Sequence, residues 1–429
     1  MRPENQYFDI YPRIVLAGSE AVITIRPLFD HCRWIADRPC EVTIFPAENA
    51  IGKSDWNEVS PIHCLPQNGA LQVTYCFDGE QEYIMRIRAA QGEPGGTLEF
   101  RLYALEADLF ARRPYKGDTH LHSCRSDGRE SPAYVAAACR RIGLDFMAIT
   151  DHRLYAPSLE AASAFADLAL DLRIYPGEEV HPPGNRAHIV NFGGRFSINA
   201  LFDTPEYRAG VAAIEKALTD FPAGVDRYPY ASCVWCFDKI RQAGGLGIFC
   251  HPYWFYEHHY DLPQTLCTLL FERQPYDALE LIGGYHLYES ESNNLQVMRY
   301  CEERARGRHI PIVGASDAHG CETGELFGWF YTIVFAPTSD LPDLIASIKD
   351  LYSVAVEALP GEVVRVYGPF RLVRYAHYLM REILPSHDEL CVEEGRLMQA
   401  HLAGDTNAAE MLRLLAGRTA RLYEHFWQQ

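Results

Sequence analysis

The sequence predicts an α/β protein in which a parallel sheet or barrel follows a small antiparallel β-sandwich and precedes a helical extension. Short apolar or alternating runs fill residues 12–110, separated by Pro, Gly, Asn and Asp, as in a sandwich. From there to about residue 336, apolar runs of four to six residues alternate with helical stretches, which is typical of parallel sheets and barrels. After about residue 340 the pattern becomes mostly helical.

The first region contains runs with the two-residue period of half-buried strands. Turn-forming residues bound each run. In chain order the runs are "RIVLAGSEAVITIRPL", "CEVTIFPA", "LQVTYCF", "EYIMRIRA" and "TLEFRLYAL". The segment "ARRPYKG" then looks like a short connector. We therefore expect the sandwich domain to occupy residues 1–112.

The second region alternates strands and helices. One helix can be placed closely, because Ser131 suits its N-cap, Pro132 its first turn and Gly143 its end, which predicts a helix over about residues 132–142. The expected strands of this region are "FMAIT", "RIYPG", "HIVNF", "GIFCHP", "ALELI", "IPIVGASD" and "YTIVF". We expect functional side chains at the C-terminal ends of these strands.

The last region contains helical patterns without a polar cluster. Ser386 and Glu389 fit a capping box. One helical face carries Leu412, Leu415, Leu422 and Phe426. A packing or oligomerisation extension over residues 357–429 is the expectation, and the oligomeric state stays open.

Composition restricts the partners. A formal net charge of −18 argues against extended nucleic-acid binding and against anionic membranes, since both need a basic face, so a small molecule is the expected partner. The chain has no apolar run of about eighteen residues and its first residues lack the apolar core of a signal peptide, so we expect a cytoplasmic location. The 13 cysteines are scattered and suit reduced core thiols, "CVWC" included.

The histidines carry the functional signal, because 11 of the 17 lie between residues 111 and 340. His120 and His122 are two residues apart, so on an extended backbone both leave the same face and could reach one metal ion. Asp317 and His319 in "GASDAHG" repeat this spacing. Further candidates at strand ends are Asp127, the Asp151-His152 pair, Glu178 or Glu179, His188 and His251. This mixture of imidazole and carboxylate suits Zn²⁺, Mn²⁺ or Fe²⁺.

The order of these motifs resembles a known family. "DTHLHS…SDG", "AITDH", "GEE", "HIVNFG", "CHP" and "GASDAHG" are similar, in sequence and order, to the polymerase and histidinol phosphatase (PHP) family of metal-dependent phosphoesterases. The resemblance covers roughly residues 115–356, and the sandwich and helical tail look like those of multidomain members. It implies a distorted (β/α)₇ TIM-like barrel over residues 113–356, with a site for commonly three divalent metal ions at its C-terminal mouth.

The resemblance also implies nine metal ligands in three groups. His120, His122, Glu179 and Asp317 would hold one ion. Glu179 would bridge to a second ion held by His188 and His251, and Asp127, His152 and His319 would hold the third. Glu179 is preferred to Glu178 because the family has Gly, any residue, Glu, and Gly177 fixes the frame.

Some neighbouring residues have other expected roles. Asp118 and Asp151 would orient ligand imidazoles, and His181 is open between an extra ligand and a structural role. Arg153 and Arg186 are the candidates for binding a substrate phosphate.

The implied chemistry is hydrolysis of a small phosphomonoester or phosphodiester by a metal-bound hydroxide, because clustered divalent ions lower the pKa of bound water. The catalytic residues would be His120, His122, Glu179, Asp317 and His319, acting through that water. Two alternatives stay open. The same site could attack an amide, carbamate or ester carbonyl, or the chain could be a non-catalytic binding module.

Overall fold

The structure is a computed structural model that describes residues 4–35, 37–48, 59–89, 97–286 and 289–428. The chain divides into two compact units. Unit 1 comprises Met1–Arg113, Arg374–His387 and Gly417–Gln429, and unit 2 comprises Pro114–Val373 and Asp388–Ala416. This division differs from the three expected ranges, because residues 357–429 contribute helices to both units instead of forming a separate one.

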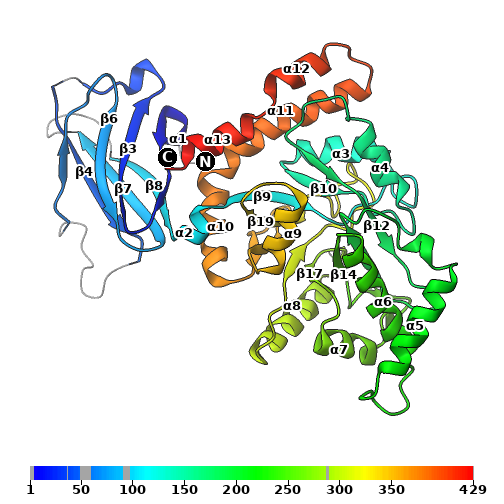
Figure 1. Ribbon diagram of the computed structural model, residues 1–429. Helices are drawn as coiled ribbons and strands as arrows, with labels where there is room; N and C mark the ends of the chain where they lie inside the picture. The colour runs from blue at the N-terminus through cyan, green and yellow to red at the C-terminus, as the bar shows by residue number, and fades with distance from the viewer. Residues whose placement is uncertain (1–3, 36, 49–58, 90–96, 287–288, 429) are drawn as a thin grey trace. The chain divides into compact units, whose positions relative to one another are not determined.

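Unit 1 contains two β-sheets (Figure 1). One has the order β1-β3-β6, and the other has the order β2-β8-β7-β4-β5. All pairs are antiparallel except β2 with β8. The bounds are β1 Phe8–Tyr11, β2 Ile14–Leu16, β3 Ser19–Pro27, β4 Cys40–Pro46, β5 Ile62–Cys64, β6 Leu71–Phe77, β7 Gln81–Ala89 and β8 Leu98–Leu105, with short helices α1 Glu4–Tyr7, η1 Asp30–Cys32 and α2 Ala107–Phe110.

The two sheets of unit 1 share one apolar core. Ile23 and Val73 come from the first sheet, and Val42, Met85 and Phe100 from the second; all are fully buried and belong to one cluster. Each of the five apolar runs predicted as strand contains a strand of this unit. The predicted runs therefore correspond to strands of these two sheets, but β1 and β5 were not among them.

C-terminal helices complete unit 1. It includes most of α10 (Phe370–Glu382), the start of α11 (Leu384–Leu402) and all of α13 (Arg418–Phe426). Tyr378 of α10 donates to the carbonyl of Arg101 at 3.1 Å, and the backbone N–H of Gln428 donates to Ile14 at 2.9 Å. The capping box is wrong, because α11 begins at Leu384 and Ser386 lies inside it.

Unit 2 contains a six-stranded sheet, a five-stranded sheet and a small hairpin. The six-stranded sheet has the order β11-β10-β9-β19-β20-β21, and the five-stranded sheet has the order β12-β13-β14-β17-β18. The bounds are β9 Arg113–Asp118, β10 Phe146–Ala148, β11 Arg173–Tyr175, β12 Gly177–Val180, β13 Ile189–Phe192, β14 Leu246–Phe249, β17 Ala278–Ile282, β18 Ile312–Gly314, β19 Phe330–Ala336, β20 Ser353–Glu357 and β21 Arg365–Tyr367, with the hairpin β15 Phe255–Tyr256 and β16 His259–Tyr260.

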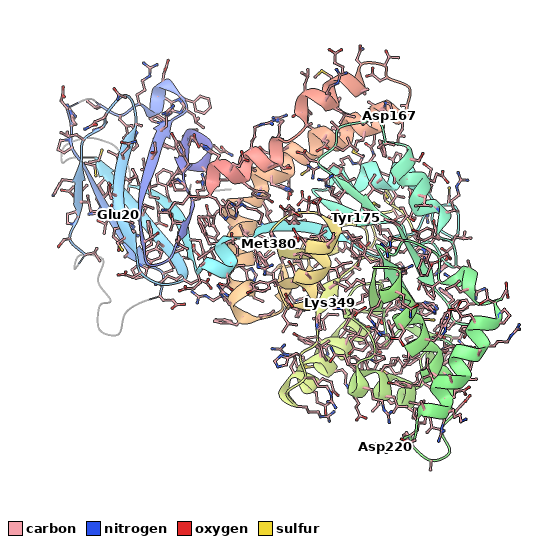
Figure 2. All side chains as sticks on the ribbon, viewed as in Figure 1. Glu20, Asp167, Tyr175, Asp220, Lys349 and Met380 are labelled. Carbon is pink, nitrogen blue, oxygen red and sulfur yellow. The ribbon has the colours of Figure 1, made fainter. Side chains whose placement is uncertain are left out.

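Helices follow the strands of unit 2 (Figure 1). They are α3 Pro132–Arg141, α4 Ala156–Ser163, α5 Pro205–Ala217, α6 Tyr228–Gln242, α7 Gln264–Arg273, α8 Ser290–Ala305, α9 Leu341–Lys349 and α12 Ala408–Leu415, with the short η3 Asn199–Leu201. The helix predicted over residues 132–142 is confirmed: the Ser131 side chain accepts from Tyr134, and Pro132 occupies the first turn. Side chains also tie helices to the rest of the unit: Lys349 of α9, labelled in Figure 2, donates to Asp277, the residue before β17, at 3.1 Å.

The strands of unit 2 are of mixed direction. β9 with β10, β14 with β17, and β17 with β18 are parallel, as predicted. β13 is antiparallel to both β12 and β14, and β20 is antiparallel to β19 and β21. β21 also lies in a range expected to be helical. Two isolated parallel bridges, Leu121 with Ala318 and His152 with Glu179, link the two sheets.

Alternate strand residues of unit 2 divide between two apolar cores, as a two-residue period requires. Phe146, Val190, Ile248 and Val313, from four strands, are fully buried in one cluster with Leu344 of α9. Neighbouring strand residues belong to a second cluster with residues of α3, α6, α7 and α8. Both faces of these strands are therefore buried, which explains their continuous apolar runs. Among the described residues, no helix is long and apolar enough to cross a membrane.

Arg140 forms a buried ion-pair network inside unit 2. Its side chain is fully buried, and it donates to Glu394 at 2.7 Å and to Asp145 at 3.0 Å. An Arg140→Met variant is expected to lower the free energy of unfolding by about 3–5 kcal/mol, because it leaves two buried carboxylates without their cation. Arg125→Met removes an exposed pair with Glu160 and should change stability far less. Urea unfolding of both variants measures the difference, and equal losses would contradict this account.

Candidate metal centre

The structure brings all nine predicted ligands into one cluster in unit 2. Four of these ligands lie at the two isolated bridges that link the sheets. His120 and His122 flank Leu121, which bridges to Ala318, and His152 itself bridges to Glu179. Ligand atoms within 4.8 Å of one another form sets that could hold an ion. These sets include His122, Asp127, His152 and His319; His120, His251 and Asp317; and His120, His122 and Glu179.

Glu179, and not Glu178, faces the histidines. The two residues are adjacent in β12, so their side chains leave opposite faces of the strand. Glu178 accepts from Ser197 at 2.7 Å and from Asn199 at 2.9 Å, away from the cluster. Both glutamates are fully buried, which means that each needs polar partners in the interior.

The two carboxylate oxygens of Glu179 face different imidazoles. Oε2 lies 3.7 Å from Nε2 of His120 and 3.6 Å from Nε2 of His122. Oε1 lies 2.8 Å from Nδ1 of His188 and 3.5 Å from Nε2 of His251. Glu179 therefore lies between two pairs of histidines, a position from which one carboxylate can bridge two ions.

Asp317 is a second carboxylate beside the histidine pair His120 and His122. Its Oδ1 lies 3.2 Å from Nε2 of His120 and 2.9 Å from Nε2 of His122. Burial acts to raise the pKa of Asp317, but the neighbouring His120 and His122 hold it well below its usual range. The carboxyl is therefore ionised and available as a ligand.

A third group lies at the more open side of the cluster. Asp127 Oδ2 is 3.1 Å from Nε2 of His152, and its Oδ1 is 3.4 Å from Nε2 of His319. The ring of His319 stacks on that of His122, with centroids 4.2 Å apart. Asp127 is 53% exposed and Glu179 is fully buried, so this third group is the part of the cluster most accessible to solvent.

The antiparallel direction of β13 brings His188 into the cluster. His188 precedes this strand, and at the start of a parallel strand it would lie at the opposite edge of the sheet from His251. Because β13 runs against β12 and β14, its start lies beside their ends, and the N–H of Cys250 donates to the carbonyl of His188. The predicted all-parallel order could not have placed this histidine.

Three non-glycine residues at the site have left-handed backbone conformations. Arg153, His251 and Asp317 have φ of 61°, 23° and 50°. Such conformations cost about 1–3 kcal/mol each and persist where the surroundings impose them. Two of the three are predicted ligands, and the third follows the ligand His152.

The buried polar atoms fit a divalent cation. Nε2 of His120, both ring nitrogens of His122, both oxygens of Glu179 and Nδ1 of His188 are buried, and the polar groups beside them are other candidate ligands of the same cluster. Buried polar atoms normally have partners, since leaving one without a partner costs free energy. Imidazole nitrogen and carboxylate oxygen together are a donor set for Zn²⁺, Mn²⁺ or Fe²⁺.

The predicted roles of Asp118 and Asp151 are wrong. Asp118 accepts from the backbone N–H of His120 at 3.1 Å and of Ser316 at 3.2 Å. Asp151 accepts from the backbone N–H of Ser123 at 2.8 Å and from its hydroxyl at 2.5 Å. Both carboxylates therefore fix the backbone of the ligand-bearing loops and leave the imidazoles to other partners.

Glu280 holds the imidazole of His120, and the sequence analysis missed it. Its Oε2 lies 2.8 Å from Nδ1 of His120, both side chains are fully buried, and its Oε1 accepts from the N–H of His251 at 3.3 Å. A carboxylate on the second nitrogen of a ligand histidine fixes its tautomer and orientation. The available signal was a single glutamate inside the apolar run "ALELI".

Replacing Glu280 tests this positioning role. Glu280→Ala is expected to lower metal affinity by about 10–100-fold, because His120 loses the partner that orients it. Glu303→Ala is the matched control, since Glu303 is an equally buried carboxylate that pairs with Arg306 on α8. Metal titration of both folded variants gives the comparison. Equal affinity in the Glu280 variant and the wild type would rule out the role.

His181 also lies at the cluster. Its Nε2 is 3.3 Å from Oε2 of Glu179 and 3.1 Å from Nδ1 of His152. Its ring stacks on that of His188, with centroids 4.0 Å apart. The structure therefore places His181 within reach of the site, although the resemblance assigns it no ligand role.

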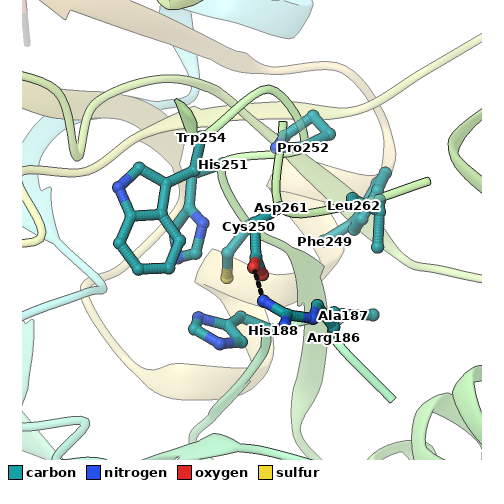
Figure 3. Close-up of a pocket in the computed structure, with 10 residues that line it drawn as sticks. All are labelled: Arg186, Ala187, His188, Phe249, Cys250, His251, Pro252, Trp254, Asp261 and Leu262. Carbon is teal, nitrogen blue, oxygen red and sulfur yellow. Dashed lines mark hydrogen bonds and ion pairs between the residues drawn. The ribbon is translucent and has the colours of Figure 1, made fainter. Parts of the chain in front are cut away.

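The two predicted phosphate-binding arginines have different surroundings. Arg153 is exposed, its backbone N–H donates to the carbonyl of Glu179 at 2.9 Å, and its guanidinium has no partner among the described residues. Arg186 forms an ion pair with Asp261, beside a pocket lined by His188, His251 and Trp254 (Figure 3). Arg153 is therefore the arginine that can reach a ligand without breaking an ion pair.

Two histidines of the cluster differ in protonation. Burial lowers the pKa of His188 to about 4, so this imidazole is neutral at pH 7. Burial also acts to lower the pKa of His152, but hydrogen bonds to Asp127 and Glu179 raise it to about 10. The neutral His188 can bind a metal directly, whereas His152 must first lose a proton.

Metal uptake should therefore release protons. The proton on His152 stabilises the metal-free fold fully below the unfolded pKa of about 6.5, and this contribution is lost as pH rises through about 10. Apparent metal affinity should accordingly increase from pH 6 towards pH 10. Calorimetric titrations with Zn²⁺ in buffers of different ionisation enthalpy count the protons released. A count of zero at pH 7, with affinity independent of pH, would contradict this expectation.

Comparisons with known proteins cover parts of the chain. No family model matches it. Over 57 residues, 13% of this chain and 10% of the relative, it is 42% identical to the DNA polymerase/3'-5' exonuclease PolX of Bacillus subtilis. The comparisons support the resemblance to the PHP family.

Solved structures give weaker similarities. A two-domain protein of Bacteroides vulgatus containing a predicted PHP-like metal-dependent phosphoesterase has a TM-score of 0.37 and 18% identity, covering 57% of this chain and 65% of that one. An amidohydrolase of Chromobacterium violaceum has a TM-score of 0.31 and 20% identity, covering 48% of this chain and 87% of that one. The chain thus spans less than two thirds of the Bacteroides protein and a tenth of the polymerase. Within the chain itself, the histidine and carboxylate clusters are groups that could hold metal ions.

Proposed function

We propose that the chain is a metal-dependent phosphoesterase that hydrolyses a small phosphomonoester or phosphodiester. The observation that carries the proposal is the position of Glu179, whose two fully buried oxygens face separate histidine pairs. Such a carboxylate is suited to bridging two cations. Asp127, His152 and His319 form the group that would hold a third ion.

The proposed ligands follow the three groups. His120, His122, Glu179 and Asp317 would hold the first ion, Glu179 would share the second with His188 and His251, and Asp127, His152 and His319 would hold the third. When bound, divalent ions supply a hydroxide at neutral pH and polarise phosphoryl oxygens. Because Zn²⁺, Mn²⁺ and Fe²⁺ all accept this donor set, the residues do not select among them.

The protein's own groups bind and orient the ester. Arg153 follows the ligand His152 and has an exposed guanidinium, so it can form a bidentate contact with phosphate oxygens. Glu280 and the backbone contacts of Asp118 and Asp151 hold the ligand-bearing loops in place. The exposed third group lies where an ester can enter from solvent. No serine or cysteine nucleophile is required.

The scaffold proposed for this site is a distorted barrel. β9 pairs with β10, and the His152–Glu179 bridge connects the end of β10 to the five-stranded sheet β12-β13-β14-β17-β18. The Leu121–Ala318 bridge connects the end of β18 back to that of β9, which closes a ring of strands. The buried cluster of Phe146, Val190, Ile248 and Val313 suits the interior of such a ring. The ligand-bearing loops would then share one mouth.

A substrate panel tests the proposed function. The protein, loaded in turn with Mn²⁺, Fe²⁺ and Zn²⁺, is assayed with phosphomonoesters, phosphodiesters, carbamates and aryl esters. We expect release of phosphate from a monoester, or of an alcohol and a monoester from a diester, and no comparable cleavage of carbamates. Preferential cleavage of carbonyl substrates would replace the phosphoesterase proposal with an amide or ester hydrolase using the same residues. A net charge of −18 makes long nucleic acids poor substrates, so short nucleotides belong in the panel.

A further inference from the structure

We propose that Trp254 and Tyr256 form a stacking platform for a planar aromatic ring of the substrate, such as a nucleobase or an aryl group. The inference rests on the proposed phosphoesterase function and names its substrate class. It comes from the hairpin β15–β16, which follows the predicted ligand His251 and is not used by the metal centre itself.

Trp254 connects this hairpin to the metal centre. The centroid of its ring lies 6.0 Å from the ring of His188 and 6.0 Å from that of His251. Figure 3 shows the indole beside the imidazole of His251, at the edge of the pocket. A group stacked on this indole would therefore lie next to the proposed second ion.

Tyr256 extends the aromatic surface away from the metal centre. Its ring lies 5.2 Å from that of Trp254 with an interplanar angle of 32°, and it is 46% exposed. Aromatic pairs at such distances are favourable, and the exposed part of the Tyr256 ring is available to a third ring. Together the two side chains form a continuous surface from the imidazoles outwards to solvent.

The opposite face of the hairpin provides an internal control. Phe255 pairs in register with Tyr260, and their rings contact each other at 5.3 Å. Because successive residues of a strand alternate in direction, Phe255 lies on the other face from Trp254 and Tyr256. Phe255 is 39% exposed, so its removal changes a similar side chain without touching the platform.

Charged side chains do not account for substrate recognition in the pocket that Trp254 lines. Arg186 is the one guanidinium or ammonium group among the described residues that line the pocket, and it is paired with Asp261. Apart from Arg186 and Asp261, the lining consists of aromatic and apolar residues and of Cys250, His188 and His251. A ring that stacks is therefore the substrate feature that this pocket can select.

Binding of non-hydrolysable ligands tests the platform. Mn²⁺-loaded protein is titrated calorimetrically with two matched pairs: phenylphosphonate against methylphosphonate, and the methylene phosphonate analogues of adenosine 5′-monophosphate and ribose 5-phosphate. In at least one pair, the ligand with a ring should bind at least about tenfold more tightly. The pair that shows this preference identifies an aryl group or a nucleobase as the ring.

Substitutions test whether Trp254 and Tyr256 cause the tighter binding of ligands that carry a ring. Trp254→Ala and Tyr256→Ala should each reduce it, and Phe255→Ala should keep it. Tyr256→Ala, on the exposed hairpin, keeps the test valid if Trp254→Ala does not fold. Equal binding with and without a ring, or a preference that survives in the folded variants, would overturn the platform and leave the phosphoesterase proposal intact. If no phosphonate bound at all, both proposals would fail.

Discussion

Glu179→Ala is expected to remove bound metal and to reduce hydrolysis by more than about 100-fold, exceeding the effect of losing a partner that only orients a ligand. Glu179 contacts both proposed histidine pairs, so its removal affects two ions at once. Burial acts to raise the pKa of Glu179, but His188 and the other imidazoles hold it well below its usual range, so the wild-type carboxylate is charged. The variant would leave His188 without the carboxylate that it faces, whereas His120 and His122 would keep only Asp317.

Glu178→Gln is the matched control for Glu179. Glu178 is the adjacent residue, equally buried, but it accepts from Ser197 and Asn199 on the other face of β12. We expect the Gln variant to unfold more easily, because an amide group would face these donors, and to retain its metal. Mass spectrometric metal analysis and phosphate release distinguish the two variants. If Glu179→Ala kept both metal and activity, the bridging assignment would be wrong.

Asp317→Asn should reduce hydrolysis by at least about 100-fold with the fold retained. The substitution removes the negative charge that lies beside both His120 and His122. Asparagine is the suitable replacement because residue 317 has a φ of 50°, and asparagine tolerates the left-handed region better than alanine. The expected signature is therefore a loss of kcat and of metal in a protein with wild-type circular dichroism.

Asp37→Asn controls for the backbone conformation. Asp37 has a φ of 61°, is exposed and lies in unit 1, so it combines the same substitution with the same left-handed backbone. It should leave kcat and metal content unchanged. Comparable losses in both variants would mean that the effect of Asp317→Asn comes from the change of residue and not from the metal centre.

Local patterns were sufficient for many of the strands, although not for β1, β5 and β21, and for one helix terminus. The run "ALELI" corresponds to β17, and Ser131 caps α3 as predicted, because periodicity and capping depend on neighbouring residues. The choice of Glu179 over Glu178 depended on the family resemblance. The structure explains it by the alternation of side chains along β12.

Contacts between residues far apart in the sequence could not be predicted from local patterns. Glu280 contacts His120 across 160 residues, and a glutamate within an apolar run gives no sign of its partner. The direction of β13 is likewise set by its neighbours β12 and β14 and not by its own residues. The roles predicted for Asp118 and Asp151 failed for a related reason. Sequence proximity to a histidine does not reveal whether a carboxylate contacts its ring or its backbone.

The most direct test of the metal-dependent account is metal content measured together with phosphoester hydrolysis on one preparation. Protein purified without added metal is analysed for bound elements, stripped with a chelator, and reloaded with Mn²⁺, Fe²⁺ or Zn²⁺. The account predicts more than one ion per chain and phosphoester hydrolysis that disappears on stripping and returns on reloading. Absence of bound metal, with no hydrolysis after any of the three ions is supplied, would contradict it.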